Sequence, residues 1–329
     1  MTDTGKPLLE VSGISVAYPG PRRPFWQGRA EPFIAVDRVS FSIRPGETLG
    51  LVGESGSGKS TIGRALLRRL PTVAGSITFR GEDITRLSGR RLAGIRRHMQ
   101  PVFQDPYATL NPRMSIGEII AEPLEIHGLA TGSEARLRVR ELLQLVGLAP
   151  DFIDRPPAGF SGGQRQRIGI ARALALSPEL IIADEPISAL DVSIRAQIVN
   201  LFGDLQRRFG MAYLFIAHDL AIVRHISHRI AILYAGRIVE IGDSEQIFRQ
   251  PRHPYTRALI ASVPVPDPTR RHERRPSIAG ELVLDREAVG CRFAPRCPLA
   301  TDTCRQAPPP LADDGSGRLV ACWRAGEVA

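Results

Sequence analysis

Two stretches near the start of the chain alternate apolar and polar positions with the period of a β-strand. They cover residues 8–18 and 34–43 and predict two strands of an antiparallel layer. The segment between them, residues 19–32, is rich in proline, glycine and arginine, which predicts a long loop. A short apolar run at residues 48–52 then predicts a buried strand, and a helix is expected over residues 58–70.

The middle of the chain carries apolar residues at helical spacing. Ile116, Ile119, Ile120 and Leu124 show this spacing, which recurs up to residue 155 and predicts a helical insertion. Strands and helices then alternate along the chain, over residues 179–184, 193–209, 212–217, 219–226 and 229–235. Alternation of this kind predicts an α/β fold in which helices cover a mostly parallel sheet.

A glycine-rich loop connects the predicted buried strand to the helix that follows it. Residues 53–60, GESGSGKS, match the phosphate-loop pattern G-x-x-x-x-G-K-S in the strand–loop–helix context that this pattern requires. Backbone amides converge there on phosphate oxygens, Lys59 would reach the β- and γ-phosphates, and Ser60 would ligate Mg²⁺. The alternative is an ordinary turn before a helix. The candidate nucleotide-binding residues are Gly53, Ser55, Gly56, Ser57, Gly58, Lys59, Ser60 and Thr61.

Two acidic residues and a histidine follow later predicted strands. Asp184 ends an apolar strand, Glu185 comes directly after it, and His218 follows the next strand along the chain. Taken alone, an acidic pair at a strand end is more often a solvated turn, and a single histidine is more often structural. Their place downstream of a phosphate loop favours a catalytic interpretation, because phosphoryl transfer needs a metal ion and an oriented base.

A segment of small and amide residues lies between these elements. Residues 161–164, Ser-Gly-Gly-Gln, open a predicted helix over residues 162–176 and so form another anion-binding helix N-terminus. Together with the phosphate loop, the acidic pair and His218, this ordered set resembles the ATP-binding cassette (ABC) family. The resemblance implies a P-loop NTPase core of the ABC ATPase type, with an antiparallel β subdomain, a helical subdomain and a small cysteine-containing C-terminal extension. It also implies ATP and Mg²⁺ as cofactors and ATP hydrolysis as the activity.

The resemblance assigns roles to residues around the nucleotide. Asp184 would hold Mg²⁺ through water, and Glu185 would polarise the attacking water. Gln104 matches the family's glutamine loop, which touches Mg²⁺ or the water and joins the core to the helical insertion. His218 matches the switch histidine that contacts the γ-phosphate, and Tyr18 matches the aromatic residue that stacks on adenine.

In the family, the signature segment (residues 161–164) serves the nucleotide that an opposite subunit holds. Its residues here are Ser161, Gly162, Gly163 and Gln164, preceded by Phe160 where the family usually has leucine. Asp191 ends residues 188–191, which match the loop that couples the two sites across the dimer. The resemblance therefore implies that a second ATPase subunit faces this one.

Further residues narrow the resemblance, over nearly the whole chain, to the ATPase subunits of bacterial oligopeptide and dipeptide importers. They lie at residues 103–106, 110–114, 160–167, 186–192, 253–259 and 290–298. The implied function is to power peptide import through a membrane permease, and an importer for nickel or another small solute is the alternative. The implied organisation is a nucleotide-binding domain at residues 1–262, with a helical subdomain at about residues 105–178, and a C-terminal extension at residues 263–329.

The same resemblance implies the partners of the chain. They are a second ATPase subunit, favoured as a related chain rather than a copy, two membrane permease subunits and, through the permease, an extracytoplasmic solute-binding protein. No apolar run reaches the roughly 18 residues that cross a bilayer, and the start of the chain has no signal pattern. We therefore expect a peripheral protein on the cytoplasmic side of the inner membrane.

The chain carries a formal charge of +9, and residues 61–100 contain nine arginines. Such a basic face can meet solvent, an anionic membrane surface or nucleic acid, but no nucleic-acid motif accompanies it, so we expect no nucleic-acid partner. A DNA-repair or chromosome ATPase of the same superfamily is a less favoured alternative, because no coiled coil or zinc module separates Lys59 from Ser161. A non-enzymatic regulatory subunit would lack Lys59 or Glu185, and both are present.

All four cysteines lie in the C-terminal extension, at Cys291, Cys297, Cys304 and Cys322. In a reducing compartment such a cluster favours metal binding over disulfides. The spacing C-x5-C-x6-C-x17-C lacks the close pairs usual in structural zinc sites, and Cys297-Pro298 is similar to the end of a ferredoxin ligand run. We therefore favour a [4Fe–4S] cluster, which the resemblance to the importer tail also implies, over zinc and over free or oxidised thiols. Arg292 and Arg296 would offset the charge of this cluster.

Overall fold

The computed structural model describes residues 5–20, 31–105, 109–263 and 289–327. The chain divides into two compact units, each assembled from separate stretches of the sequence. The first unit comprises residues 1–9, 43–48 and 79–216, and the second comprises residues 10–42, 49–78 and 217–329. Each unit therefore depends on contacts between residues that are far apart along the chain.

The first unit contains a parallel sheet built from β6, β7 and β8. β7 (Leu180–Asp184) pairs with β6 (Met99–Val102) on one side and with β8 (Ala212–Ala217) on the other. Nearly every position of β7 and β8 is apolar and buried, as expected for parallel strands that are covered on both faces. α7 (Val192–Phe209) packs on β8, where the Phe202 ring meets those of Tyr213 and Phe215 edge to face.

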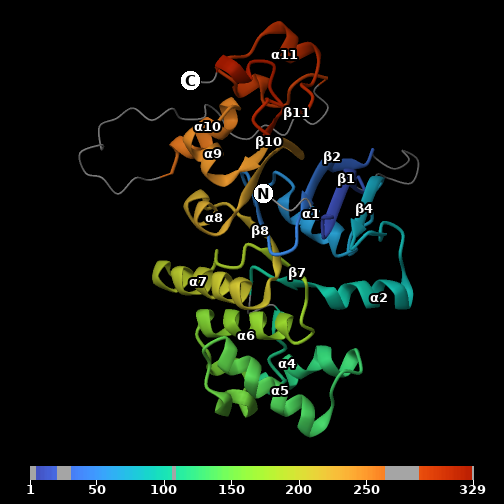
Figure 1. The fold of residues 1–329 in the computed structure, drawn as a ribbon, viewed down its shortest axis with the longest axis vertical. Coiled ribbons are helices and arrows are strands. Elements are labelled where there is room, and N and C mark those ends of the chain that lie inside the picture. The colour runs from blue at the N-terminus through green and yellow to red at the C-terminus, as the bar shows by residue number, and fades with distance from the viewer. Residues whose placement is uncertain (1–4, 21–30, 106–108, 264–288, 328–329) are drawn as a thin grey trace, which may run out of the picture. The chain divides into compact units, whose positions relative to one another are not determined.

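Three helices of the first unit lie together (Figure 1, green). They are α4 (Ile116–Ile126), α5 (Gly132–Leu145) and α6 (Gly162–Leu174), with 3₁₀ turns at Pro150–Asp154 and Pro157–Gly159. α4 begins with a capping box in which Ser115 and Glu118 each accept a hydrogen bond from the other's backbone N–H. These helices occupy the region in which the sequence predicts a helical insertion. β5 (Glu82–Asp83) and α2 (Gly89–His98) also belong to this unit.

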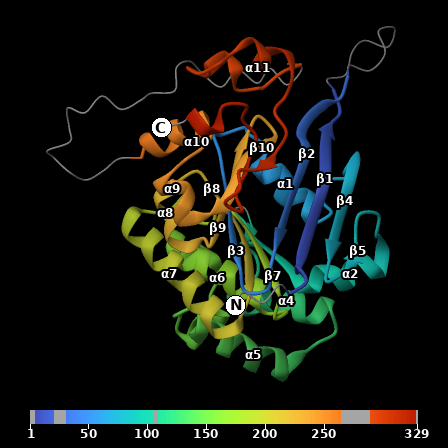
Figure 2. The ribbon, with the colours of Figure 1, turned by 45° about the horizontal axis from the view of Figure 1, so that its top comes forward.

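The second unit contains strands of two sheets. β1 (Leu9–Tyr18), β2 (Phe33–Ile43) and β4 (Ala74–Phe79) lie side by side in the order β2–β1–β4 (Figure 2). β3 (Thr48–Val52) pairs in parallel with β9 (Arg229–Tyr234), which pairs antiparallel with β10 (Arg237–Asp243). β12 (Leu319–Val320) pairs with β10, and β11 (Ala312–Asp313) pairs with β12. The C-terminal extension therefore adds short strands beside β10.

Five helices lie in the described part of the second unit. They are α1 (Lys59–Leu66), α8 (Leu220–Ile226), α9 (Ser244–Arg249), α10 (Pro254–Ala261) and α11 (Asp302–Gln306), with 3₁₀ turns at Ala294–Arg296 and Ala325–Glu327. A side chain caps the N-terminus of α8, α9 and α10. Asp219 and Asp243 accept hydrogen bonds from the first turns of α8 and α9. Across the described ranges, none of the helices combines the length and apolarity needed to cross a membrane.

A buried group of charged residues attaches the end of the extension to β10. The Arg318 side chain is 1% exposed, and its guanidinium lies 3.5 Å from the carboxylate of Glu240, which is 0% exposed. Glu240 also accepts hydrogen bonds from the backbone N–H groups of Arg252 and His253, and Arg318 donates to Asp314 at 2.6 Å. Charges this deeply buried are tolerated only when they are paired, so these contacts fix Arg318 beside Glu240 and Asp314.

Candidate nucleotide-binding and catalytic site

The phosphate loop (residues 53–60) connects β3 to α1, as the sequence predicts. Gly58 is the N-cap of α1 with a φ of 109°, and a Cβ atom there would lie 2.8 Å from the carbonyl oxygen of Ala35, so glycine is required. The buried Lys59 side chain donates to the carbonyl oxygens of Gly53 and Glu54 at 2.8 and 2.9 Å. The loop therefore surrounds the Lys59 ammonium group at the N-terminus of α1, which is the positive end of the helix dipole.

Tyr18 lies beside the helix that follows the phosphate loop. It ends β1, and its hydroxyl oxygen is 3.2 Å from the hydroxyl oxygen of Thr61, in the first turn of α1. The other predicted residues of the loop differ in exposure: Ser55 and Gly56 are exposed, Gly53 and Ser57 are buried, and Ser60 is half-buried. The structure therefore brings Tyr18 and the phosphate loop together in the second unit.

The predicted acidic pair lies at the carboxyl end of β7. Asp184 is the last residue of β7 and Glu185 follows it. Glu185 has a φ of 49°, in the left-handed region that residues other than glycine rarely adopt, and its backbone N–H donates to the Ile216 carbonyl oxygen at 2.9 Å. This hydrogen bond to β8 fixes the backbone at the end of β7, where Glu185 follows Asp184.

Gln104 lies in the loop after β6 and is exposed. The carbonyl oxygen of the preceding residue, Phe103, accepts a hydrogen bond from the Gln166 side-chain amide at 3.4 Å. Gln166 lies in α6, which begins with the signature segment, and it is 2% exposed. Gln166 therefore links the signature helix to the glutamine loop. Sequence reasoning does not single out this residue, although an amide on the buried face of a helix is a signal for such a link.

Ser161 of the signature segment is the N-cap of α6. Its hydroxyl oxygen accepts from the Gln164 N–H at 3.3 Å, and the Gln164 side chain accepts from the Ser161 N–H at 3.0 Å, which makes a capping box. A serine hydroxyl that accepts a hydrogen bond still carries its own proton. Ser161 is exposed, so capping is compatible with donation to an anion at this helix N-terminus.

Close packing explains the second glycine of the signature segment. A Cβ atom on Gly163 would lie 2.5 Å from Cγ2 of Ile194 in α7, whereas one on Gly162 would lie 3.4 Å from Cδ2 of Leu190. Asp191 follows Leu190 and is the exposed N-cap of α7. The starts of α6 and α7 therefore lie next to each other in the first unit, which places Asp191 near the signature segment.

His218 is exposed and follows β8. The next residue, Asp219, caps α8 by accepting from the Ala221 N–H at 3.0 Å, which fixes the backbone just after His218. The predicted residues are thus divided between the units. The phosphate loop, Tyr18 and His218 belong to the second unit, and Gln104, the signature segment, Asp184, Glu185 and Asp191 belong to the first.

The four cysteines line one small cavity in the C-terminal extension, and none of them forms a disulfide. Burial raises the pKa of Cys291 and of Cys297, and it raises that of Cys322 to about 11, which favours the protonated thiols. Within the part of the chain that the structure describes, no group of three or more histidine, cysteine or acidic side chains is arranged to hold a metal ion.

Arg292 and Arg296, which the sequence places next to the cysteines, each pair with a carboxylate. The Arg292 guanidinium lies 2.6 Å from the carboxylate of Asp37 in β2, and that of Arg296 lies 3.0 Å from the carboxylate of Glu54. Both positive charges are therefore already matched by carboxylates of the second unit. Arg324, which pairs with Glu327, lines the cysteine cavity.

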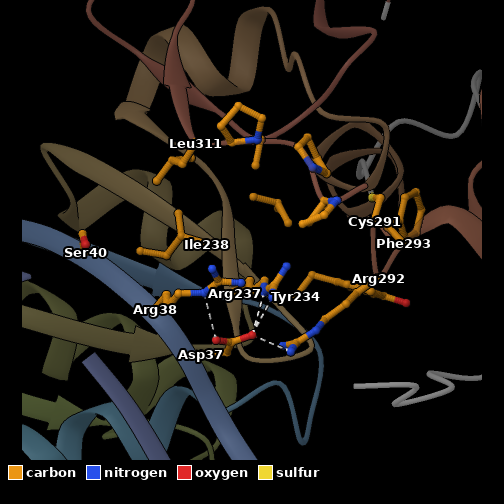
Figure 3. A pocket seen from close by; sticks show the side chains of 15 residues that line it. Asp37, Arg38, Ser40, Tyr234, Arg237, Ile238, Cys291, Arg292, Phe293 and Leu311 are labelled. Carbon is orange, nitrogen blue, oxygen red and sulfur yellow. Dashed lines mark hydrogen bonds and ion pairs between the residues drawn. The ribbon is translucent and has the colours of Figure 1, made fainter. Parts of the chain in front are cut away.

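The carboxylate of Asp37 forms ion pairs with three arginines, as Figure 3 shows. The distances from its oxygens to the guanidinium nitrogens are 2.7 Å for Arg237, 2.6 Å for Arg292 and 3.4 Å for Arg38. Although burial opposes ionisation, these arginines hold the pKa of Asp37 below its ordinary value. Because Arg237 lies in β10 and Arg292 in the extension, Asp37 joins β2 to both.

Comparison with known proteins finds two family matches in this chain. Residues 36–188 match the ABC transporter family, and residues 239–304 match the C-terminal region of oligopeptide/dipeptide transporters. The putative oligopeptide transport ATP-binding protein YkfD of Bacillus subtilis is 52% identical over 319 residues, which cover 96% of this chain and 95% of that protein. A putative peptide import ATP-binding protein of Brucella ovis is 50% identical over 325 residues, which cover 98% and 99% of the two chains.

Solved structures of ABC proteins share the fold. The ATP-binding cassette MJ0796, seen as a dimer in a post-hydrolysis state with ADP and Pi, is 29% identical and has a TM-score of 0.63 over 72% of this chain and 98% of its own. CbiO1 of Clostridium perfringens, part of the ABC transporter complex CbiONQ, has a TM-score of 0.64 over 75% of this chain and 92% of its own at 24% identity. The predicted fold class and ATPase activity are confirmed. The chain belongs to the ABC transporter family, as an ATPase that carries the C-terminal region of the oligopeptide/dipeptide transporters.

Proposed function

We propose that this chain hydrolyses ATP to power the import of di- or oligopeptides through a membrane permease. One observation carries the proposal: the chain combines an ABC transporter match with an oligopeptide/dipeptide transporter C-terminal region, and relatives that share this length are named for peptide transport. The proposed organisation is a nucleotide-binding domain at residues 1–262, with a helical subdomain at about residues 105–178, followed by the extension at residues 263–329.

The phosphate loop would bind the phosphates of ATP through its backbone amides and Lys59, and Tyr18 would stack on adenine. The buried Lys59 at the start of α1 and the contact of Tyr18 with Thr61 support these roles. Ser60, Asp184 and Gln104 would hold Mg²⁺, which supplies positive charge to the phosphate oxygens when it is bound. Hydrolysis would then depend mainly on positioning and charge stabilisation by these residues.

Glu185 would orient the attacking water and accept its proton, and His218 would contact the γ-phosphate. The strained backbone of Glu185 and its hydrogen bond to β8 support a fixed position for this carboxylate. Because the folded chain already holds this base in position, little entropy is lost in orienting it during hydrolysis, and the activation free energy is lower.

The signature segment and Asp191 would complete the nucleotide site of a facing ATPase subunit. The exposed N-cap Ser161 and its remaining hydroxyl donor support this role, as does the dimer in which the cassette MJ0796 was solved. The proposed partners are a related ATPase chain, two permease subunits and, through the permease, an extracytoplasmic solute-binding protein. The proposed location is the cytoplasmic face of the inner membrane.

Affinity purification of the tagged chain from detergent-solubilised membranes tests this function. We expect two permease subunits and a second, related ATPase to co-purify, and we expect peptide-loaded binding protein to stimulate the ATPase activity of this complex. Stimulation by nickel-loaded binding protein alone would replace peptides with nickel as the solute. Recovery of DNA-repair proteins without a permease would contradict a transport role.

We also propose that Cys291, Cys297, Cys304 and Cys322 hold a [4Fe–4S] cluster. Their location around one cavity supports the proposal, because four thiolates are the usual ligands of such a cluster. The absence, within the described ranges, of a closed single-ion site counts against the zinc alternative. It counts less against a cluster, because four iron atoms keep their thiolate ligands further apart than one ion does. Arg324 would face the cluster charge from the cavity wall.

Protein purified without oxygen is expected to be brown and to contain iron and acid-labile sulfide. Cys297→Ser should remove the colour and make the extension more sensitive to protease, because metal binding contributes to the folding of such regions. Asp302→Asn, on the exposed surface of α11, is the matched control and should keep both iron and colour. Stoichiometric zinc without iron would replace the cluster by a zinc site, and absence of any metal would overturn both.

A further inference from the structure

The C-terminal extension contacts the phosphate loop directly within the second unit. Arg296 ends the 3₁₀ turn Ala294–Arg296, immediately before Cys297. Its Nη1 atom is 3.0 Å from Oε2 of Glu54, the second residue of the phosphate loop, and its Nη2 atom is 3.3 Å from Oε1. A guanidinium that pairs with both carboxylate oxygens fixes the orientation of the carboxylate as well as its distance. The Arg296 side chain is 8% exposed and that of Glu54 is 24% exposed.

A second contact holds the same loop residue through its backbone. The Glu54 N–H donates to the Tyr255 hydroxyl at 3.0 Å, and Tyr255 is 0% exposed. The Tyr255 ring packs against those of Tyr234 and Phe293, with centroids 4.7 and 5.5 Å away. Phe293 belongs to the extension and is 2% exposed. The extension therefore holds the Glu54 side chain and also packs against the residue that holds the Glu54 backbone.

Glu54 places a negative charge in a loop whose proposed task is to bind the polyphosphate of ATP. Without a partner, this carboxylate would repel the phosphates, and the guanidinium of Arg296 cancels most of that repulsion. The position of Glu54 also affects Lys59, because the Lys59 ammonium donates to the Glu54 carbonyl oxygen at 2.9 Å. A shift of Glu54 would therefore displace the lysine that is proposed to reach the phosphates.

We propose that Arg296 is a positioning residue for ATP binding: through Glu54 it fixes the start of the phosphate loop and neutralises a carboxylate that opposes the polyphosphate. This inference rests on the proposed role of the phosphate loop. It makes the cysteine-bearing extension part of the nucleotide-binding apparatus, and the attachment of the extension sets the ATP affinity of the subunit.

Equilibrium binding of ATP with Mg²⁺ to the purified full chain tests the inference. Arg296→Gln should raise the Kd by about tenfold, because it leaves the Glu54 charge unmatched beside the phosphates. The double variant Glu54→Gln/Arg296→Gln should return the Kd to within about threefold of wild type, because no unmatched carboxylate remains. In steady-state ATPase kinetics of the assembled complex, Arg296→Gln should act mainly by raising the KM for ATP rather than by lowering kcat.

Arg305→Gln is the matched control, because it removes another arginine of the extension whose partner, Asp302, is an exposed residue of the same helix. It should leave the Kd within about twofold of wild type. Arg296→Lys, which keeps the charge but loses the paired geometry, should fall between wild type and Arg296→Gln. An unchanged Kd in Arg296→Gln would overturn the inference, as would a double variant that binds ATP as poorly as Arg296→Gln alone.

Two further variants keep the test decisive. Tyr255→Phe replaces Arg296→Gln if circular dichroism shows that Arg296→Gln does not fold. It keeps the aromatic packing but loses the hydroxyl that accepts from the Glu54 N–H, so the Kd for ATP should rise by about threefold. An unchanged Kd in Tyr255→Phe would overturn the inference. Lys59→Ala tests the premise of the inference, which is that the phosphate loop binds ATP. If Lys59→Ala abolishes binding while Arg296→Gln does not weaken it, the positioning role alone is wrong. If Lys59→Ala binds ATP like wild type, the phosphate-loop assignment itself is wrong.

Discussion

Glu185→Gln is expected to leave ATP binding intact and to lower the ATPase turnover of the assembled complex by about 10²–10⁴-fold, the usual contribution of a general base. The amide keeps the size of the side chain but has no basic oxygen to accept a proton from the attacking water. The strained backbone at residue 185 should persist, since it is held by the hydrogen bond to Ile216. Steady-state ATPase activity, measured beside nucleotide affinity, checks this prediction.

Glu179→Gln is the matched control for this variant. Glu179 lies just before β7, pairs with Arg80 and His98, and has no proposed part in the chemistry. Its turnover should stay within about twofold of wild type, because exposed ion pairs contribute little. If Glu185→Gln retains turnover within about threefold of wild type, Glu185 is not the base.

Ser161→Arg is expected to abolish ATPase activity and transport in the complex, while the isolated subunit still binds one ATP with wild-type affinity. Ser161 would serve the nucleotide of the facing subunit, so its loss blocks closure of the pair and not loading of this subunit. A bulky cation also opposes the positive N-terminus of α6. ATPase activity of the complex and nucleotide titration of the isolated subunit give the two measurements.

Two alanine variants separate the contribution of Ser161 to protein stability, as the N-cap of α6, from its proposed role in ATP hydrolysis. Ser161→Ala and Ser115→Ala each remove the N-cap of a capping box in the first unit, at a cost of about 1 kcal/mol of stability. Only Ser161→Ala should impair ATP hydrolysis. An equal loss of ATP affinity in the isolated Ser161→Arg subunit would show that Ser161 acts on the nucleotide of its own chain.

Elements with a strong local pattern could be predicted from the sequence. β3 is a continuous apolar run, and α7 carries an apolar stripe, so both appear where expected. α2 was not predicted, because its ten residues are rich in arginine and none is buried, so no apolar periodicity marks it. β12 has only two residues and exists because β10, far away in sequence, offers an edge beside the buried pair of Arg318 and Glu240. No local pattern could reveal such a strand.

The same distinction applies to the candidate site. The phosphate loop and signature segment are contiguous motifs, so the sequence alone identifies them. The contacts of Glu54 with Tyr255 and Arg296 join residues that are 201 and 242 positions apart, and they depend on how the extension packs. Sequence reasoning instead placed Arg296 beside the cysteines, because proximity along the chain was the only information available. The structure shows that a carboxylate of the phosphate loop is its partner.

Uptake of a labelled peptide into vesicles that contain the purified complex, with ATP supplied on the side of this chain, tests peptide import most directly. The complex should accumulate peptide only when ATP and a peptide-loaded binding protein are both present, and the Glu185→Gln complex should accumulate none. A complex that hydrolyses ATP and accumulates nickel or another small solute, but never peptide, would contradict the proposed function.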